Sequence, residues 1–314
     1  ALWREYSFYT ELASAKQLAS LDKFIHVPKP LVACWGPEKG QEARNFLLVL
    51  ERLQPPTWSR VDPVEGCSVQ QAVSAVRALG QFHAKLGMAW IPHWAMNGPV
   101  IGPEPLDNIY GACFGRCAAR LRKLLSPVGF GICFKLVQGG LQKLVNMLRK
   151  PPHTLLHGDY RTENIRFAPG ASGPVAVFDW GLVSRGRGSW DFAHFLALSL
   201  RPELRRGHQE EIVRKYLQQF PGDRTSASSV DLFKDEVRAG FLCLIAKLLF
   251  VFVDFQGKPQ TLEMLERSLQ WTTSAAEDWA ALTVLLKSEA FGRSTQWPDP
   301  LRQRPVEGHV GRWG

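Results

Sequence analysis

The chain has 314 residues, of which 45% are hydrophobic and 21% charged, and its formal net charge is +9. This composition excludes an intrinsically disordered chain and is sufficient for one large domain or for a small and a large lobe. Lysine and arginine are spread along the chain and are not grouped with stacking aromatic residues, so we expect a basic solvated surface and no nucleic-acid partner.

The first part of the chain combines one helix pattern with two strand patterns. We predict a helix over about residues 2–20, followed by strands near 31–36 and 45–50. The segment Gln54-Pro55-Pro56-Thr57-Trp58 is typical of a linker. We therefore expect a change of architecture at this linker.

The remainder of the chain is predicted to be mainly helical. Ser68 is suited to cap an amphipathic helix that runs to about Leu86, with His83 on its apolar face as a core or boundary histidine. A loop rich in proline and glycine covers residues 92–105. Further helices are predicted over about 108–125, 132–149, 190–200, 208–219, 229–255 and 259–287.

Six cysteines at scattered spacings, with no secretory segment before them, predict reduced thiols and a cytoplasmic protein. Cys113 and Cys117 lie four residues apart and Cys133 follows, but no Cys-x-x-Cys or histidine cluster completes a zinc site, so we expect buried thiols. The longest apolar run, 239–253, is interrupted by Lys247 and is shorter than the roughly 20 residues that span a bilayer. We expect a buried helix there and no membrane span.

The most informative segment precedes the helix predicted over 190–200. It reads His157-Gly158-Asp159-Tyr160-Arg161-Thr162-Glu163-Asn164 and is followed by Phe178-Asp179-Trp180-Gly181. Four residues separate Asp159 from Asn164, as in the Asp-x-x-x-x-Asn of kinase catalytic loops. The spacing indicates phosphoryl-transfer chemistry.

The residues between Asn164 and Asp179 predict a β-hairpin. Two short apolar stretches flank the turn Ala168-Pro169-Gly170-Ala171-Ser172-Gly173-Pro174. The midpoint of positions 164 and 179 falls in this turn, so a symmetric hairpin brings both side chains to its open end. Taken alone, Asn164 could be a turn former and Asp179 a solvated strand end. Together, an amide oxygen and a carboxylate directed at one space form a minimal magnesium site.

With these motifs, the chain resembles the aminoglycoside phosphotransferase and choline kinase-like (CHK) family, including its ecdysteroid-kinase-like branch. His-Gly-Asp in place of His-Arg-Asp marks this group, and Gly188-Ser189-Trp190-Asp191-Phe192-Ala193-His194-Phe195-Leu196 resembles another family segment. The resemblance implies an α+β, protein-kinase-like fold of two lobes. Residues 1–53 would be a partial N-terminal lobe, 54–292 a mainly helical C-terminal lobe and 293–314 a poorly ordered tail.

The resemblance also implies roles in catalysis. Asp159 would orient the acceptor hydroxyl and accept its proton, while Asn164 and Asp179 would hold Mg²⁺ against the phosphates of ATP. Arg161 would reach the transferring phosphate, unless it pairs with Glu163.

Two further residues would support the catalytic loop. His157 would organise it by packing and backbone hydrogen bonds. Asp191 would brace the same loop, or else be an ordinary aspartate in the first turn of a helix.

Two segments nearer the N-terminus resemble nucleotide-binding parts of the family. Trp3-Arg4-Glu5-Tyr6-Ser7-Phe8-Tyr9-Thr10-Glu11-Leu12 resembles its Glu-x-x-Phe-Tyr helix, in which Glu5 would pair with a strand lysine that holds the phosphates. Asn45-Phe46-Leu47-Leu48-Val49-Leu50-Glu51-Arg52-Leu53 resembles the strand that leads into the hinge. The backbone from Glu51 to Leu53 would bind adenine, unless it is a plain core strand ending in a polar turn.

The start of the chain departs from the family pattern, because no lysine and no glycine-rich loop precede Glu5. Lys16, Lys23 and Lys29 lie on or after the first helix, and none is a convincing replacement. Two explanations are open. If the chain is a fragment of a longer product, which we favour, we expect an ATP-dependent phosphotransferase acting on a small-molecule hydroxyl. If the protein has lost the phosphate-loop strands, we expect a catalytically silent module that binds a nucleotide or a partner. Aminoglycoside, choline-like, sterol and sugar acceptors all agree with the sequence.

Overall fold

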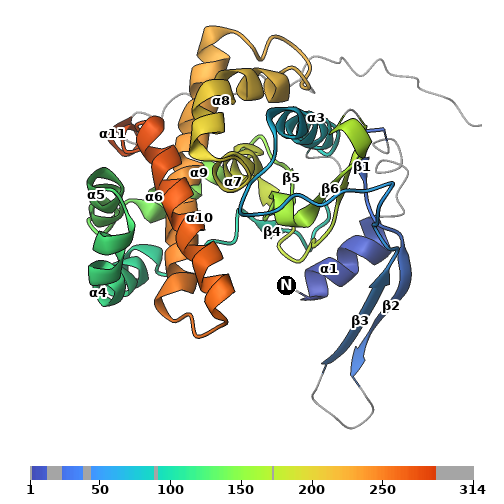
Figure 1. Cartoon of the computed structure of the whole chain (residues 1–314), viewed down its shortest axis with the longest axis horizontal. Helices are drawn as coiled ribbons and strands as arrows, with labels where there is room; N and C mark the ends of the chain where they lie inside the picture. Colours follow the sequence, from blue (N-terminus) through green and yellow to red (C-terminus); the bar gives the residue numbers. More distant parts are fainter. Residues whose placement is uncertain (1, 13–22, 38–43, 88–90, 172, 288–314) are drawn as a thin grey trace, which may run out of the picture.

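The computed structural model describes residues 2–12, 23–37, 44–87, 91–171 and 173–287. Helices dominate, and short strands form three small sheets, as the α+β prediction requires. A strand hairpin and the first helix lie at one end of the molecule, and the long helices lie at the other (Figure 1). The predicted tail, 293–314, falls outside the described residues, and the lobe boundary at residue 53 stays a prediction.

The first predicted helix begins as expected but changes its hydrogen bonding after two turns. Helix α1 (Leu2–Ser7) continues as a π-helical turn, η1 (Phe8–Leu12). The later part of the predicted helix lies outside the described residues. Phe8 is fully buried and stacks on Trp180 with ring centroids 3.9 Å apart, so aromatic packing anchors this segment to the centre of the protein.

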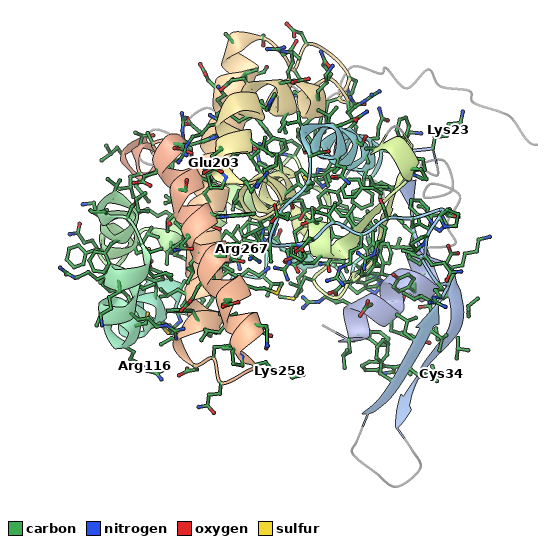
Figure 2. All side chains as sticks on the ribbon, in the orientation of Figure 1. Lys23, Cys34, Arg116, Glu203, Lys258 and Arg267 are labelled. Carbon is green, nitrogen blue, oxygen red and sulfur yellow. The ribbon has the colours of Figure 1, made fainter. Side chains whose placement is uncertain are left out.

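The two strands predicted before the linker form an antiparallel hairpin. Strand β2 (Pro30–Pro37) pairs with β3 (Arg44–Leu50), and Cys34 lies opposite Leu47. The hairpin extends away from the helical body, with Cys34 on its exposed side (Figure 2).

The hairpin predicted around residues 168–174 is confirmed. Strands β6 (Ile165–Phe167) and β7 (Val175–Val177) are antiparallel, with Ile165 opposite Val177. Strand β1 (Ile25–His26) adds to β7 in parallel. A two-residue strand carries no alternating pattern, which is why the sequence did not predict β1.

Three short strands form a third sheet. Its order is β4 (Met96–Asn97), β8 (Ser184–Gly186) and β5 (Thr154–Leu156). The segment 92–105, predicted as a loop, therefore contributes a short strand.

Helix α3 (Val69–Lys85) matches the prediction closely. The hydroxyl of Ser68 accepts a hydrogen bond from the amide of Gln71, and the side chain of Gln71 accepts one from the amide of Ser68. This reciprocal capping box fixes the start of the helix. Helix α4 (Leu106–Leu124) also agrees with its prediction.

The helix predicted over 132–149 is wrong, because the chain forms two helices. Helix α5 (Pro127–Leu136) ends before Gly139 and Gly140, whose φ angles are 97° and 112°, and α6 (Leu141–Leu148) starts after them. Two residues with positive φ cannot continue a right-handed helix.

Two other helix boundaries also differ. Helix α8 (Pro202–Leu217) starts earlier than predicted, since proline is accommodated at the first helical position. The helix predicted over 259–287 is divided into α10 (Pro259–Asp278) and α11 (Thr283–Lys287), with Ala280 between them at φ 49°.

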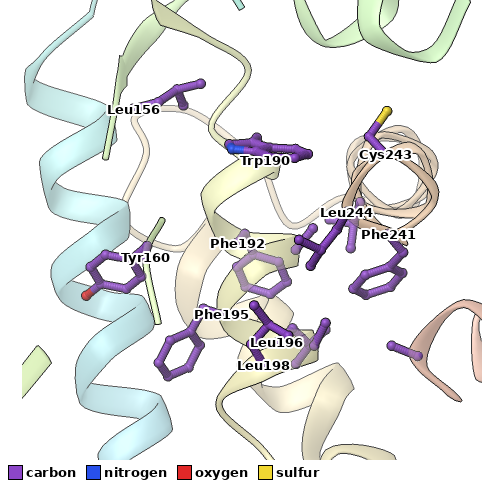
Figure 3. Close-up of a cluster of buried hydrophobic side chains, with 14 of the residues drawn as sticks. Leu156, Tyr160, Trp190, Phe192, Phe195, Leu196, Leu198, Phe241, Cys243 and Leu244 are labelled. Atoms are coloured by element: carbon purple, nitrogen blue, oxygen red, sulfur yellow. The ribbon is translucent and has the colours of Figure 1, made fainter. Parts of the chain in front are cut away.

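The core forms where α7 (Ser189–Leu198) packs on α9 (Ala227–Val253). Every residue of α7 is buried. Figure 3 shows buried side chains of α7 and α9 together with Leu156 of β5 and Tyr160, which follows β5 in the chain; those from the two helices are Trp190, Phe192, Phe195, Leu196, Phe241 and Leu244. In the described ranges, no helix has the length and apolar character to cross a membrane.

The six cysteines are all free. Burial raises the pKa of the Cys117 thiol to about 11 and that of Cys133 to about 12, so both stay protonated at neutral pH. Among the described residues, no three His, Cys, Asp or Glu side chains group as metal ligands. The cytoplasmic location stays a prediction.

Basic side chains lie over separate parts of the surface. Lys23, Arg116 and Lys258 occupy well-separated positions in Figure 2. This distribution agrees with the expected basic solvated surface, while the absence of a nucleic-acid partner stays a prediction.

The close packing of α7 on α9 predicts that alanine substitutions at two helical glycines change the free energy of unfolding in opposite directions. A Cβ on Gly240 would lie 2.6 Å from the Cβ of Ala193, whereas a Cβ on Gly115 would meet no atom within 4 Å. Gly240→Ala should lower the free energy of unfolding by roughly 1–3 kcal/mol through overpacking. Gly115→Ala should raise it by roughly 0.5–1 kcal/mol through helix propensity. Urea unfolding of both variants tests this, and equal effects would contradict the packing described.

Candidate active site

One buried carboxylate holds the backbone of the loop that carries Asp159. Asp191, in the first turn of α7, accepts the amide of His157 at 2.7 Å and the amide of Gly158 at 2.9 Å. Burial opposes its ionisation, but His83 and the charge and hydrogen bonds around it keep the pKa of Asp191 below its usual value. Asp191 therefore braces the loop, as the resemblance implied.

His83 connects this carboxylate to a third helix. Its Nε2 lies 3.2 Å from Asp191 Oδ2, and its Nδ1 lies 2.7 Å from the hydroxyl oxygen of Tyr216 on α8. The prediction of a core histidine is confirmed, because the side chain is buried. Its polar contacts join α3, α7 and α8.

Gly158 has a backbone conformation that excludes side chains. Its φ is 87°, and a Cβ at this position would lie 2.2 Å from the carbonyl oxygen of Leu182. A glycine is therefore required immediately before Asp159.

His157 is a fully buried structural histidine. Its Nε2 donates to the carbonyl of Phe178 at 3.0 Å, and its Nδ1 accepts the amide of Asp159 at 3.2 Å. These partners require the neutral ring with its proton on Nε2, and burial lowers the pKa of His157. The ring also packs on Trp180, with centroids 4.5 Å apart. This geometry agrees with the supporting role expected for His157.

Asn164 and Asp179 stand at the open end of the β6–β7 hairpin. The amide of Phe178 donates to the carbonyl of Asn164 at 3.2 Å, which extends the ladder by one residue. The Nδ2 of Asn164 donates to the carbonyl of Asp159 at 3.0 Å and to its Oδ2 at 3.1 Å. Because Nδ2 is hydrogen-bonded to Asp159, Oδ1 is the atom of Asn164 that can bind a cation.

Asp179 follows the hairpin in a left-handed conformation, with φ 64°. Aspartate tolerates this conformation better than most residues. Glu5 of α1 lies near it, and the amide of Trp180 hydrogen-bonds to the Glu5 carboxylate. Burial is the main cause that raises the pKa of Glu5, and the negative charge of Asp179 raises it further. Two crowded carboxylates and an amide oxygen are hard ligands that suit a divalent cation.

The Asp159 carboxylate lies among basic side chains. Arg161 Nε is 3.3 Å from Asp159 Oδ2, and Arg161 Nη1 is 3.4 Å from Glu163 Oε1. Lys247 Nζ of α9 is 3.7 Å from Asp159 Oδ1, and His194 Nε2 of α7 is 3.6 Å from the same oxygen. Burial opposes ionisation of Asp159, but the positive charges of Lys247 and then Arg161 hold its pKa well below the usual range.

The sequence matches the phosphotransferase enzyme family over residues 5–227, which is more than half of the chain. The chain belongs to this family. A putative aminoglycoside phosphotransferase from Ralstonia eutropha JMP134 is similar in structure, with a TM-score of 0.50 at 16% identity, and the alignment covers 89% of this chain and 83% of that one. The likeness confirms the protein-kinase-like fold.

Two other solved structures are more distant. Amicoumacin kinase hAmiN, solved with AMP-PNP and Ca²⁺, is 14% identical with a TM-score of 0.48, over 81% of this chain and 74% of that one. A choline/ethanolamine kinase family protein from Mesorhizobium loti is 13% identical with a TM-score of 0.47, over 90% and 84%. No curated protein matches the sequence.

Membership of the phosphotransferase family confirms the predicted enzyme class, and no observation favours the silent module. The lysine expected to pair with Glu5 does not appear among the ion pairs of the described residues. Lys29 contributes its backbone amide, which donates to the Glu51 carboxylate at 3.1 Å. Lys16 lies outside the described residues.

The side chain of Glu51 has a structural role, because it contacts residues before β2. His26 Nε2 lies 2.5 Å from its carboxylate, and its own amide donates to the carbonyl of Lys29 at 2.9 Å. These contacts tie the end of β3 to β1 and to the start of β2. Adenine binding by the backbone from Glu51 to Leu53 stays a prediction.

Sequence reasoning missed Lys247 and His194. Lys247 was noted only as an interruption of an apolar run, and His194 only as part of a family segment. The signal for Lys247 was available, since a lysine on the buried face of an apolar helix requires a partner. Nothing in the sequence indicated that the partner would be Asp159.

The burial of His194 predicts a pH effect on stability. Burial and the ammonium of Lys247 lower the pKa of His194 to about 3, so between about pH 6.5 and 3 the unfolded chain binds a proton that the folded chain does not. His194 therefore contributes stability above pH 6.5 that is lost as the pH falls. Between pH 7.5 and 5.5, the free energy of unfolding should drop by about 1.4 kcal/mol more in wild type than in His194→Gln. Urea unfolding at both pH values measures the difference, and identical drops would contradict a neutral, buried His194.

Proposed function

We propose that this phosphotransferase transfers the γ-phosphoryl group of ATP to a hydroxyl of a small molecule, with Asp159 facing the acceptor. The observation that carries the proposal is the placement of Asp159. Its carboxylate is 20% exposed, is ionised by its basic neighbours, and is hydrogen-bonded to Asn164 at the open end of the hairpin. Family membership supplies the reaction class.

In this reaction the acceptor hydroxyl donates a hydrogen bond to Asp159. A bond then forms between the acceptor oxygen and the γ-phosphorus, the bond from phosphorus to the bridging oxygen of ADP breaks, and the hydroxyl proton passes to Asp159. A carboxylate with so low a pKa is a weak base, so Asp159 contributes mainly by orienting the hydroxyl. This fits a loose transition state in which little proton transfer is needed early.

Arg161 is suited to the transferred phosphoryl group. It already lies between Asp159 and Glu163, its charge is permanent, and its planar group can donate to two phosphate oxygens. The two readings of Arg161 are therefore compatible, because the ion pair with Glu163 holds the side chain beside Asp159.

We propose Mg²⁺ as the cation, bound by Asn164 Oδ1 and Asp179. Few protein ligands, with water and phosphate oxygens completing the shell, are typical of this ion. When bound, Mg²⁺ supplies positive charge that neutralises the nucleotide phosphates. Glu5 would face the phosphate side of the same site, where burial and the charge of Asp179 raise its pKa. The backbone from Glu51 to Leu53 would contact adenine.

Replacing the acceptor-facing carboxylate tests the proposal. Asp159→Asn keeps the shape of the side chain and removes its charge, so kcat should fall by roughly 10² to 10⁴. Asp231→Asn, an exposed position on α9, is the matched control and should retain wild-type activity. ADP release in the presence of Mg²⁺, ATP and a set of hydroxylated metabolites gives the rates. Wild-type turnover by Asp159→Asn would sink the assignment.

A further inference from the structure

Lys247 brings an ammonium group from the centre of the helical core to the catalytic carboxylate. It is the single charged residue of the apolar run 239–253. Its Nζ lies 3.7 Å from Asp159 Oδ1, 3.3 Å from the carbonyl oxygen of Gly158 and 3.3 Å from His194 Nε2. A largely buried lysine needs such partners, so the polar groups around Asp159 fix its position.

The contacts of Lys247 leave it able to bind a substrate atom. An ammonium has three donors, and each of its three polar contacts is longer than the usual 2.7–3.2 Å of a hydrogen bond. The side chain is 17% exposed, and Nζ lies 5.8 Å from the centre of the Trp190 ring. The Asp159 side chain is 20% exposed, so two partly exposed charged groups lie 3.7 Å apart.

Two cations of the protein lie against the Asp159 carboxylate. Arg161 is shared between Asp159 and Glu163, and Lys247 supplies the second positive charge. His194 adds none, because burial and the Lys247 ammonium keep it neutral. Arg161 and Lys247 therefore weaken the attraction of Asp159 for a cationic substrate.

We infer that Lys247 sets acceptor specificity: it rejects acceptors with an amine beside the phosphorylated hydroxyl and selects those with an oxygen there, to which Nζ donates a hydrogen bond. The inference rests on the proposed function, because it places the acceptor hydroxyl at Asp159. It narrows the acceptors compatible with the sequence to polyols, sugars and hydroxy acids, and it disfavours amino alcohols and amino sugars phosphorylated next to their amine.

The hydrogen bond from Nζ sets the size of the effect. A neutral oxygen on the carbon next to the bound hydroxyl accepts this bond, whereas an ammonium has no lone pair to accept it. A hydrogen bond to a charged donor corresponds to roughly tenfold to a hundredfold in kcat/KM.

Matched acceptor pairs on the full chain test the inference. Each pair shares a carbon skeleton and differs in one substituent: ethanolamine with ethylene glycol, serinol with glycerol, and glucosamine with glucose. Phosphate transfer from ATP is measured for wild type, Lys247→Met and Lys247→Arg. The ratio of kcat/KM within a pair cancels any effect of the substitution on Asp159 that both acceptors share.

Wild type should favour the oxygen member of each pair by at least tenfold, Lys247→Arg should keep that ratio, and Lys247→Met should reduce it toward one. Lys234→Met is the matched control, since Lys234 lies on the same helix but pairs with Glu210 at 2.7 Å, and its ratio should equal that of wild type. Preference of wild type for the amines, or an unchanged ratio in Lys247→Met, overturns the inference while the proposed function stands. Transfer to none of these acceptors overturns the inference if other hydroxylated metabolites are phosphorylated, and it contradicts the proposed function as well if none of them is.

Discussion

Two hydrogen bonds from the amides of His157 and Gly158 to Asp191 fix the path of the catalytic loop. They are strong because the acceptor is ionised and excluded from water. Through His83 and Tyr216 the same carboxylate is joined to two more helices, so the loop is supported from α3, α7 and α8 at once. A loop held in this way keeps the partly exposed Asp159 carboxylate in a fixed orientation, and Gly158 allows its turn at φ 87°.

The fixed loop also explains the electrostatics of the site. Asp159 is held beside Lys247 and Arg161, so its carboxylate stays ionised despite burial. Under the proposed function, Asp159 would therefore contribute mainly by orienting a hydroxyl and not by basicity, as expected for phosphoryl transfer. Asp179 and Glu5 form a second pair of carboxylates, which suits a cation.

The sequence was sufficient where the relevant residues are close along the chain. The hairpin from Asn164 to Asp179 follows from a local turn and its spacing, and the cap at Ser68 follows from the next three residues. The sequence was insufficient where contacts between distant segments determine which side chains lie together. Lys247 is 89 positions from Gly158, and no periodicity shows that α9 passes the catalytic loop. The helix break at 139–140 could have been predicted, since consecutive glycines in a helix pattern favour termination of the helix.

Hydrogen exchange of the His157 and Gly158 amides tests the central claim, that Asp191 holds the catalytic loop. The account predicts that both amides exchange as slowly as the slowest amides of α7, because they are released only when the core opens. In Asp191→Asn, which offers one neutral acceptor oxygen where two charged ones stood, at least one of them should exchange orders of magnitude faster. Fast exchange of both amides in the wild-type protein would contradict the account.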